Sequence, residues 1–209
     1  MKRVYFVRHG ETEGNLQKFF QFPETELSEA GHNGGKAVAR RCETLGIDML
    51  VASNFTRAQQ TAKHISECID IPVTTVDFLH ESYRPENIRG VSIEAEEGQV
   101  HKKEYENEFW NKDWRPVGAE NYFDVAKRVT ESIDYLETTD SNKILVVSHG
   151  DFIRSMSAYL LLNKNTEVEQ NRVVFESLQR MSNVAITEFI YEDGKWKLFM
   201  WNDHAHFAE

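Results

Sequence analysis

The chain begins with a short apolar strand that runs directly into an arginine and a histidine. The stretch Val4 to Val7 is rich in β-forming residues and apolar at consecutive positions, which is typical of a strand buried on both faces of an α/β sheet. Arg8, His9 and Gly10 follow, so we expect them at the carboxyl edge of the sheet, where open α/β folds place ligands. An imidazole can attack phosphorus, and a neighbouring guanidinium can bind phosphate oxygens bidentately.

A second strand repeats this ending later in the chain. The stretch Ile144 to Ser148 is again of the buried type, and it ends in His149 and Gly150. Two apolar strands that each finish in His-Gly can bring two imidazoles side by side at one sheet edge. The repetition argues against the alternative that the first Arg-His-Gly is an ordinary surface turn.

A second arginine is predicted at the same edge. A helix is expected from about Thr56, after the strand Met49 to Ser53, and Arg57 lies in its first turn. Cations are disfavoured at a helix N-terminus, so this position is better explained if an anion lies between Arg57 and the helix end. The alternative is an exposed first-turn arginine.

Two imidazoles and two guanidiniums suit a phosphoryl group, whose oxygens carry the charge that the transition state must neutralise. A metal site built on His9 and His149 is the main rival, but two nearby arginines would repel a divalent cation. A serine hydrolase is disfavoured because the sequence has no Gly-x-Ser-x-Gly motif.

Composition excludes several other classes of protein. The 209 residues fit one domain spanning 1–209, and a net charge of −10 argues against a nucleic-acid partner or an anionic membrane surface. Cys42 and Cys68 are expected to be buried free thiols in a reducing compartment. The apolar run behind the basic residues 1–3 is too short for a signal-peptide core, so we expect a cytoplasmic protein.

Periodicity predicts an α/β order that ends in a hairpin. Strands and helices alternate up to residue 162, the segment 164–182 is polar and partly helical, and Glu192-Asp193-Gly194 indicates a hairpin turn. The predicted elements are a helix from Ser28 to Gly46, strands 49–53 and 72–76, helices from 56 and 121, the strand 144–148, a helix 152–162, and hairpin strands 183–191 and 195–201.

Two segments lack a regular pattern. The polar loop 13–27 holds Phe19, Phe20 and Phe22, which we expect to pack into the core, with a substrate-facing wall as the alternative. Residues 82–119 show no long periodicity, and long irregular insertions of this kind are commonly lids over a site.

Several motifs together resemble the histidine phosphatase superfamily, whose fold is the phosphoglycerate-mutase-like one. Each motif is modest alone, but the set runs through most of the chain. The motifs are Arg8-His9-Gly10-Glu11-Thr12 with Asn15, Leu27-Ser28-x-x-Gly31, Ser53-x-x-x-Arg57-Ala58-x-Gln60-Thr61-Ala62, and Ser148-His149-Gly150, with Glu81 falling where the family places its proton donor. The resemblance implies a three-layer α/β/α fold with a mostly parallel central sheet.

The resemblance also implies an activity, that of a phosphomonoesterase of the histidine acid phosphatase type acting through phosphohistidine. His9 would attack phosphorus, while Arg8, Arg57 and His149 hold the equatorial oxygens. Glu81 would protonate the leaving alkoxide and then activate water. No metal or organic cofactor enters this scheme, and the expected partner is a small-molecule phosphate ester.

Some assignments remain open from sequence. Glu86, Glu94 or Glu120 could replace Glu81 as the acid. Further substrate contacts are expected from Asn15, Arg84 and Gly150, although Arg84 and Arg89 could equally be exposed loop arginines. His204 and His206 near the C-terminus could form a weak metal site or a flap, with an ordered or frayed tail as the alternative.

Two other activities are alternatives. After Glu81 the chain reads Ser82-Tyr83-Arg84-Pro85-Glu86, where phosphoglycerate mutases resemble one another in Arg-His-Tyr-Gly, and it lacks the insertion that seals their site. A mutase must protect phosphohistidine from water and a phosphatase need not, so a phosphatase is favoured. A non-catalytic phosphate-binding module is disfavoured because both His9 and Glu81 are present. The oligomeric state is not indicated.

Overall fold

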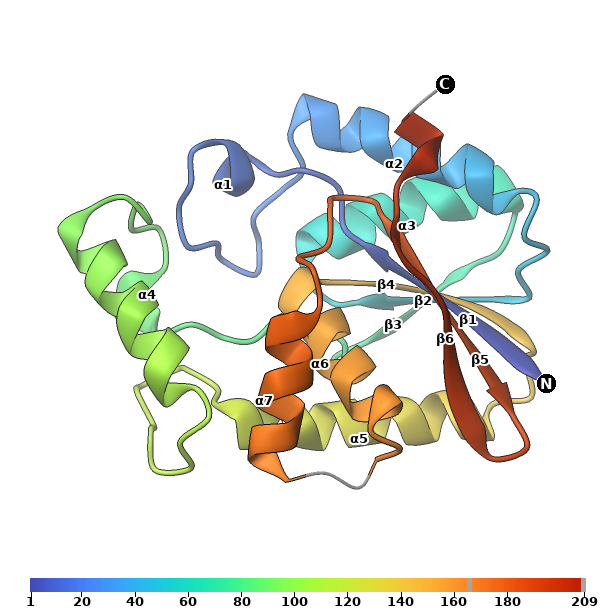
Figure 1. The fold of residues 1–209 in the computed structure, drawn as a ribbon. Coiled ribbons are helices and arrows are strands. Elements are labelled where there is room, and N and C mark those ends of the chain that lie inside the picture. Colours follow the sequence, from blue (N-terminus) through green and yellow to red (C-terminus); the bar gives the residue numbers. More distant parts are fainter. Residues whose placement is uncertain (165–166, 208–209) are drawn as a thin grey trace.

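A central sheet runs through the molecule (Figure 1). The computed structural model describes residues 1–164 and 167–207, and within them six strands lie in the order β3-β2-β4-β1-β5-β6. The first four in this order are parallel, whereas β5 and β6 add an antiparallel hairpin at one edge. The strands are β1 (Lys2–Arg8), β2 (Met49–Ser53), β3 (Val73–Val76), β4 (Lys143–Ser148), β5 (Ile186–Glu192) and β6 (Lys195–Asp203).

Strand β1 is buried on both faces, as its sequence predicts. Val4 and Phe6 belong to one hydrophobic core, and Tyr5 and Val7 belong to the other. None of the four side chains is more than 4% exposed. Because successive side chains of a strand point to opposite faces, this one apolar run contributes to both hydrophobic cores.

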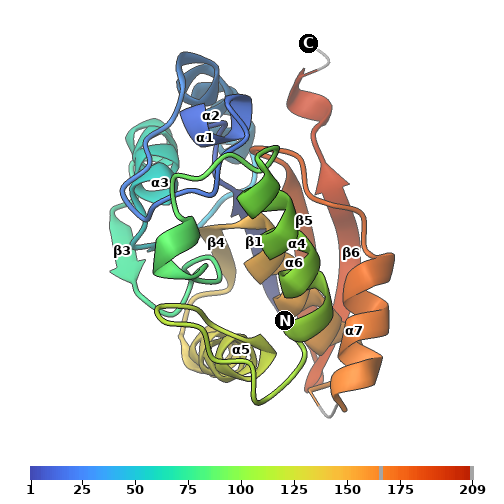
Figure 2. The ribbon, with the colours of Figure 1, turned by 90° about the vertical axis from the view of Figure 1, so that its left-hand side faces the viewer.

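Helices cover both faces of the sheet (Figures 1 and 2), and the predicted three-layer α/β/α class is confirmed. Helices α2 and α3 pack in the core of Tyr5 and Val7, and α5 and α6 pack in the core of Val4 and Phe6. Helix α7 lies against α6. The bounds are α2 (Glu29–Cys42), α3 (Thr56–Ile69), α5 (Tyr122–Thr138), α6 (Gly150–Leu161) and α7 (Val168–Ser177).

Local signals in the sequence set the ends of several elements. Ser28 Oγ accepts the backbone N–H of Gly31 at 3.0 Å, which caps α2 as predicted. The side chain of Asn121 accepts two backbone N–H groups at the start of α5. In the hairpin, Asp193 and Gly194 have φ of 52° and 73°, the positive values that a two-residue turn of this type requires.

Two helices lie where the sequence shows no clear periodicity. Helix α1 is a single turn, held by a capping box between Thr12 and Asn15. Helix α4 buries only Gly98 and His101, so its sequence carries no apolar stripe to reveal it. The predicted lid therefore contains regular structure. The bounds are α1 (Glu13–Leu16), α4 (Glu96–Glu108) and the 3₁₀ turn η1 (Glu86–Ile88).

Both ends of the described part of the chain contact helices. Lys2 Nζ donates to the carbonyls of Leu136 and Glu137, at 3.1 and 2.9 Å, and so caps the C-terminus of α5. The 3₁₀ turn η2 (Ala205–Phe207) packs against α2, where Arg41 forms an ion pair with Asp203. His206 Nδ1 also lies 3.4 Å from the Arg41 guanidinium, so the described part of the tail is ordered.

The cysteines are free, as expected, but only Cys42 is buried, because Cys68 lies at a partly exposed position of α3. Burial raises the pKa of the Cys42 thiol to about 12. Within residues 1–164 and 167–207, no helix has the length and apolar character needed to cross a membrane.

The backbone of Gly31 lies against the backbone of Glu11 in the loop after β1, so a methyl group at position 31 should destabilise the fold. A Cβ at this position would lie 1.9 Å from the carbonyl oxygen of Glu11. Gly31→Ala should lower the free energy of unfolding by about 1–3 kcal/mol in urea denaturation. Asn33→Ala, at an exposed position of the same helix, should change it by less than about 0.5 kcal/mol. Equal values for the two variants would contradict this account.

Candidate active site

The register of β1 against β4 brings the two predicted histidines together. Arg8 pairs with Ser148 in the parallel ladder, and the backbone N–H of His9 donates to the Ser148 carbonyl at 3.0 Å. The imidazole rings of His9 and His149 consequently lie 5.1 Å apart at the carboxyl edge of the sheet.

The surroundings of His9 fix its tautomer. Nδ1 lies 2.7 Å from the carbonyl oxygen of Gly10, which can only accept, so Nδ1 carries the proton. Nε2 then presents a lone pair and accepts a hydrogen bond from Arg57 Nε at 3.3 Å. His9 is only 4% exposed, and this burial, followed by the charges of Arg57 and Arg8, lowers its pKa well below the ordinary 6.5.

His149 is completely buried beside His9. Its Nε2 lies 2.9 Å from the hydroxyl of Ser53, and its Nδ1 has no hydrogen-bond partner among the described residues. Burial is the main cause that lowers the pKa of His149 well below 6.5, and Arg57 and His9 add to the effect. Both imidazoles are therefore neutral at neutral pH.

Two arginines flank the histidine pair. Arg57 is 4% exposed, donates to the Phe22 carbonyl at 3.0 Å, and lies over the ring of Phe55 at 5.0 Å. Burial lowers its pKa to about 10, so it stays charged at neutral pH. Arg8 donates to the Met181 carbonyl at 2.5 Å, and its buried Nε has no hydrogen-bond partner among the described residues.

Glu81 approaches the same place from the segment after β3. Its carboxylate accepts backbone N–H groups of Ser82 and Phe152 on Oε1, at 3.0 and 3.1 Å, and of Asp151 on Oε2, at 3.1 Å. Two of these donors belong to the first turn of α6, whose dipole favours a negative charge. Burial, followed by the Asp151 carboxylate, nevertheless raises the pKa of Glu81.

One cavity of about 820 Å³ joins these groups. Its lining includes Arg8, His9, Arg57 and Glu81, whereas the fully buried His149 does not belong to it. Its walls come from the loop 13–27, from α4 and the rest of the segment 82–119, and from α7 with the chain that follows it. The other charged residues of the wall are Arg84, Arg89, Lys102, Glu106, Asp151, Arg154, Arg172, Glu176 and Arg180.

Three residues expected to touch substrate do not line this cavity, namely Asn15, Gly150 and the fully buried His149. Asn15 serves the capping box of α1, where its Oδ1 accepts the backbone N–H of Thr12 at 3.2 Å. Gly150 is the first residue of α6 and packs against the side chain of Arg8. Arg84 does line the cavity, where it contacts Asp151 at 3.4 Å and stacks on the ring of Tyr105.

The three carboxylates considered as alternatives to Glu81 for the proton donor lie outside the cavity. Glu120 is bound to Arg128, with both carboxylate oxygens engaged at 2.8 Å. Glu94 forms an exposed ion pair with Lys18, and Glu86 is exposed at the 3₁₀ turn. None of these three acids lines the cavity, whereas Glu81 does.

The structure adds residues that the sequence analysis missed. Phe19 and Phe20 line the cavity and Phe22 is 44% exposed, so the expected core packing of these rings is wrong. Residues of their loop line the cavity instead, and the ring centroids of Phe20 and His101 of α4 lie 5.1 Å apart. Arg154 was also missed, inside the predicted helix 152–162, and so were Arg172 and Arg180, to which only the polarity of residues 164–182 pointed.

Backbone strain occurs next to the site. Val184 has φ of 53°, which is unusual for a β-branched residue, and its N–H donates to the Arg8 carbonyl at 3.0 Å. The neighbouring Asn183 side chain donates to the His9 carbonyl at 3.0 Å. This pair therefore holds the backbone from which both site residues project.

In the part of the chain that the structure describes, no group of three or more His, Cys, Asp or Glu side chains is placed to hold a metal ion. The two site histidines are instead accompanied by arginines.

Comparisons with known proteins agree with this architecture. Residues 4–204 match the model of the histidine phosphatase superfamily (branch 1), and the chain belongs to this family of phosphatases and mutases. Probable phosphoglycerate mutase GpmB of Enterobacter sp. (strain 638) is 27% identical over 96% of this chain and 90% of its own.

Solved structures extend the likeness to phosphatases. A mycobacterial glucosyl-3-phosphoglycerate phosphatase has a TM-score of 0.79 and 25% identity, over 98% of this chain and 100% of its own. A phosphoserine phosphatase variant from Entamoeba histolytica, in complex with phosphoserine, has a TM-score of 0.76 and 25% identity, over 99% of both chains.

The buried neutral histidines predict a pH-dependent stability. The unfolded chain takes up protons at these positions below pH 6.5, whereas the folded chain does so only at lower pH. The contribution of the two histidines to the free energy of unfolding should therefore fall as pH drops from 6.5 towards 5, by up to about 1.4 kcal/mol per pH unit for each histidine.

His9→Gln should reduce this slope by about 1 kcal/mol per pH unit, measured by urea unfolding between pH 7 and 5. His204→Gln, which changes an exposed histidine, serves as the control and should leave the slope unaltered. A wild-type slope in His9→Gln would show that His9 does not stay neutral.

Proposed function

We propose that the protein is a metal-independent phosphomonoesterase of the histidine acid phosphatase type, acting through a phosphohistidine on small phosphorylated metabolites. The observation that carries this proposal is the fixed tautomer of His9, whose Nδ1 proton is bound to Gly10 and whose Nε2 lone pair lies beside Arg57 in the cavity. A neutral imidazole held in this way is a competent nucleophile.

The phosphoryl group would lie between the two arginines and the two imidazoles. The buried Arg8 Nε is a donor without a partner among the described residues, which supports an anion at this place. Ser53 Oγ accepts the N–H of Phe55 and can give its own proton to His149 Nε2, which leaves an N–H on His149 Nδ1 to face an oxygen.

The first step forms the bond between His9 Nε2 and phosphorus and breaks the bond between phosphorus and the ester oxygen. Glu81 gives its proton to the departing oxygen, so the products are a neutral alcohol, a phosphohistidine and a Glu81 carboxylate. The raised pKa of Glu81 favours the protonated form that this step needs.

The second step returns the enzyme to its starting state. The Glu81 carboxylate takes a proton from water, the water oxygen attacks phosphorus, and the bond to Nε2 breaks to release inorganic phosphate. The three backbone N–H groups around Glu81 stabilise its charged form between the two steps. One carboxyl group thus serves as acid and then as base.

The second candidate is a phosphoglycerate mutase, because curated relatives carry that name. A mutase would transfer the phosphoryl group from His9 to a second hydroxyl instead of to water. The phosphatase is favoured by the structural neighbours and by the chain after Glu81, which lacks the mutase-like continuation.

The walls of the cavity favour an alcohol that carries further negative charge. Apart from Arg8 and Arg57, six of the described lining residues are cationic, against three carboxylates besides Glu81. Arg180 and Lys102 are exposed and have no ion pair within the described chain. In a chain of net charge −10, this local excess suits an anionic ester, and the segment 82–119 would act as its lid.

Hydrolysis of para-nitrophenyl phosphate tests the activity. Wild-type protein should release nitrophenol at a rate that a chelator does not change, because no step needs a metal ion. His9→Ala should lose activity by more than about 10³-fold, since it removes the nucleophile. Loss of wild-type activity on adding the chelator would contradict the mechanism.

Charge preference tests the substrate class. The wild-type enzyme should show a higher kcat/KM with para-carboxyphenyl phosphate than with its neutral analogue, para-carbamoylphenyl phosphate. Arg180→Gln should reduce the ratio between these two values by about threefold, as expected for a partly exposed ionic contact. Lys103→Gln removes an exposed cation of α4 that does not line the cavity and should preserve the ratio. No preference in the wild type would exclude an anionic alcohol.

A further inference from the structure

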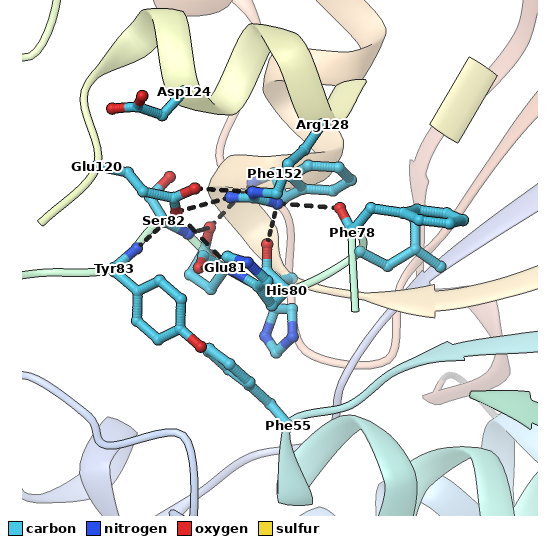
Figure 3. A network of polar contacts seen from close by, with 12 residues as sticks. Phe55, Phe78, His80, Glu81, Ser82, Tyr83, Glu120, Asp124, Arg128 and Phe152 are labelled. Atoms are coloured by element: carbon cyan, nitrogen blue, oxygen red, sulfur yellow. Dashed lines mark hydrogen bonds and ion pairs between the residues drawn. The ribbon is translucent and has the colours of Figure 1, made fainter. Parts of the chain in front are cut away.

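A largely buried ion pair lies close to Glu81 (Figure 3). Arg128 of α5 binds Glu120 through two parallel hydrogen bonds, Nε to Oε1 and Nη2 to Oε2, both 2.8 Å. The two side chains are only 11% and 14% exposed. A bidentate pair at this depth has a defined geometry, unlike most surface ion pairs.

The same pair holds the backbone on both sides of Glu81. Arg128 Nη1 donates to the carbonyls of Phe78 and His80, at 3.0 and 2.9 Å, and Glu120 Oε2 accepts the N–H of Tyr83 at 3.0 Å. Figure 3 shows Arg128 between Glu120 and these two carbonyl groups. Glu81 is therefore flanked by three backbone attachments to one side-chain pair, which we call the clamp.

Aromatic contacts connect this clamp to the phosphate site. The His80 ring stacks on Phe55 at 5.4 Å with 16° between the planes, and its Nδ1 donates to the Glu81 carbonyl at 2.8 Å. Phe55 in turn packs on Arg57. On the other side, the Arg128 guanidinium lies 4.9 Å from the ring centre of Phe152, whose backbone N–H donates to the Glu81 carboxylate.

The segment needs such support because no sheet ladder reaches it. Strand β3 ends at Val76, and residues 81–85 have no regular secondary structure. Proton transfer requires the acid within about 3 Å of the leaving oxygen, and a displacement of about 1 Å can cost about 10²-fold in rate.

We propose that Arg128 and Glu120 are positioning residues for the proton donor Glu81, and that they set the efficiency of protonation of the leaving group. The proposal rests on the proposed function, in which Glu81 is the acid. Neither residue lines the cavity, and each acts on Glu81 only through the backbone around it.

The test compares a poor and a good leaving group in the same preparation. Benzyl phosphate leaves as an alkoxide and needs the acid, whereas para-nitrophenyl phosphate leaves as a stable phenolate and depends on it little. The ratio between the two kcat/KM values does not depend on the fraction of folded enzyme. In Arg128→Lys and Glu120→Gln, kcat/KM for benzyl phosphate should fall at least about tenfold more than for para-nitrophenyl phosphate.

Two further measurements separate positioning from general damage. The inhibition constant of inorganic phosphate should stay at the wild-type value, because Arg8 and Arg57 do not belong to the clamp. Arg115→Lys is the matched control, since Arg115 pairs with Asp124 in the first turn of α5, and this pair is not part of the clamp on residues 78–83. In Arg115→Lys, the ratio of kcat/KM for benzyl phosphate to kcat/KM for para-nitrophenyl phosphate should equal that of the wild type.

Glu81→Gln sets the reference for loss of the acid, and the outcomes are distinct. The ratio of kcat/KM for benzyl phosphate to kcat/KM for para-nitrophenyl phosphate decides between them. If this ratio falls in Glu81→Gln but is unchanged in both clamp variants, Arg128 and Glu120 do not position Glu81. A loss of phosphate affinity in the clamp variants as large as their loss of kcat/KM for benzyl phosphate would also overturn the positioning role. An unshifted ratio in Glu81→Gln would instead refute Glu81 as the acid, and with it the proposed function. If Arg128→Lys fails to fold, Glu120→Gln carries the test.

Discussion

The parallel pairing of β1 with β4 is the interaction on which the rest of the site depends. It places Arg8 opposite Ser148 and thereby sets His9 beside His149 at one edge of the sheet. Parallel strands end at the same edge, so two separate segments deliver their polar ends to one place. Helix α3 then adds Arg57 and helix α6 adds the N–H groups that hold Glu81.

Burial at this edge acts on acid and base in opposite directions. It lowers the pKa of His9, which favours the neutral imidazole of the proposed nucleophile, and it raises the pKa of Glu81, which favours the protonated form of the proposed donor. Both shifts have desolvation as their largest cause. The apolar core that stabilises the sheet therefore also sets the protonation states that the proposed chemistry requires.

The sequence predicted those parts of the molecule that local patterns determine. The strand Val4 to Val7, the Ser28 cap and the Asp193-Gly194 turn each follow from a few neighbouring residues. Helix α4 was missed because it has almost no buried side chains, and the phenylalanines of the loop 13–27 were misjudged because their surroundings are set by distant segments. The pairing of Arg128 with the backbone carbonyls of Phe78 and His80 could not be predicted from sequence either, since it joins segments about 50 residues apart.

The position of β1 in the sheet also has a consequence for the nascent chain during translation. This strand is synthesised before the other strands of the sheet, yet its neighbours β4 and β5 begin only at Lys143 and Ile186. At about 5–20 residues per second, a nascent chain would carry β1 without either neighbour for about 7–27 s before β4 emerges. During that interval two unpaired strand edges and two apolar faces stay open to other chains, so protection during translation matters more here than in a fold whose first strand pairs with the next.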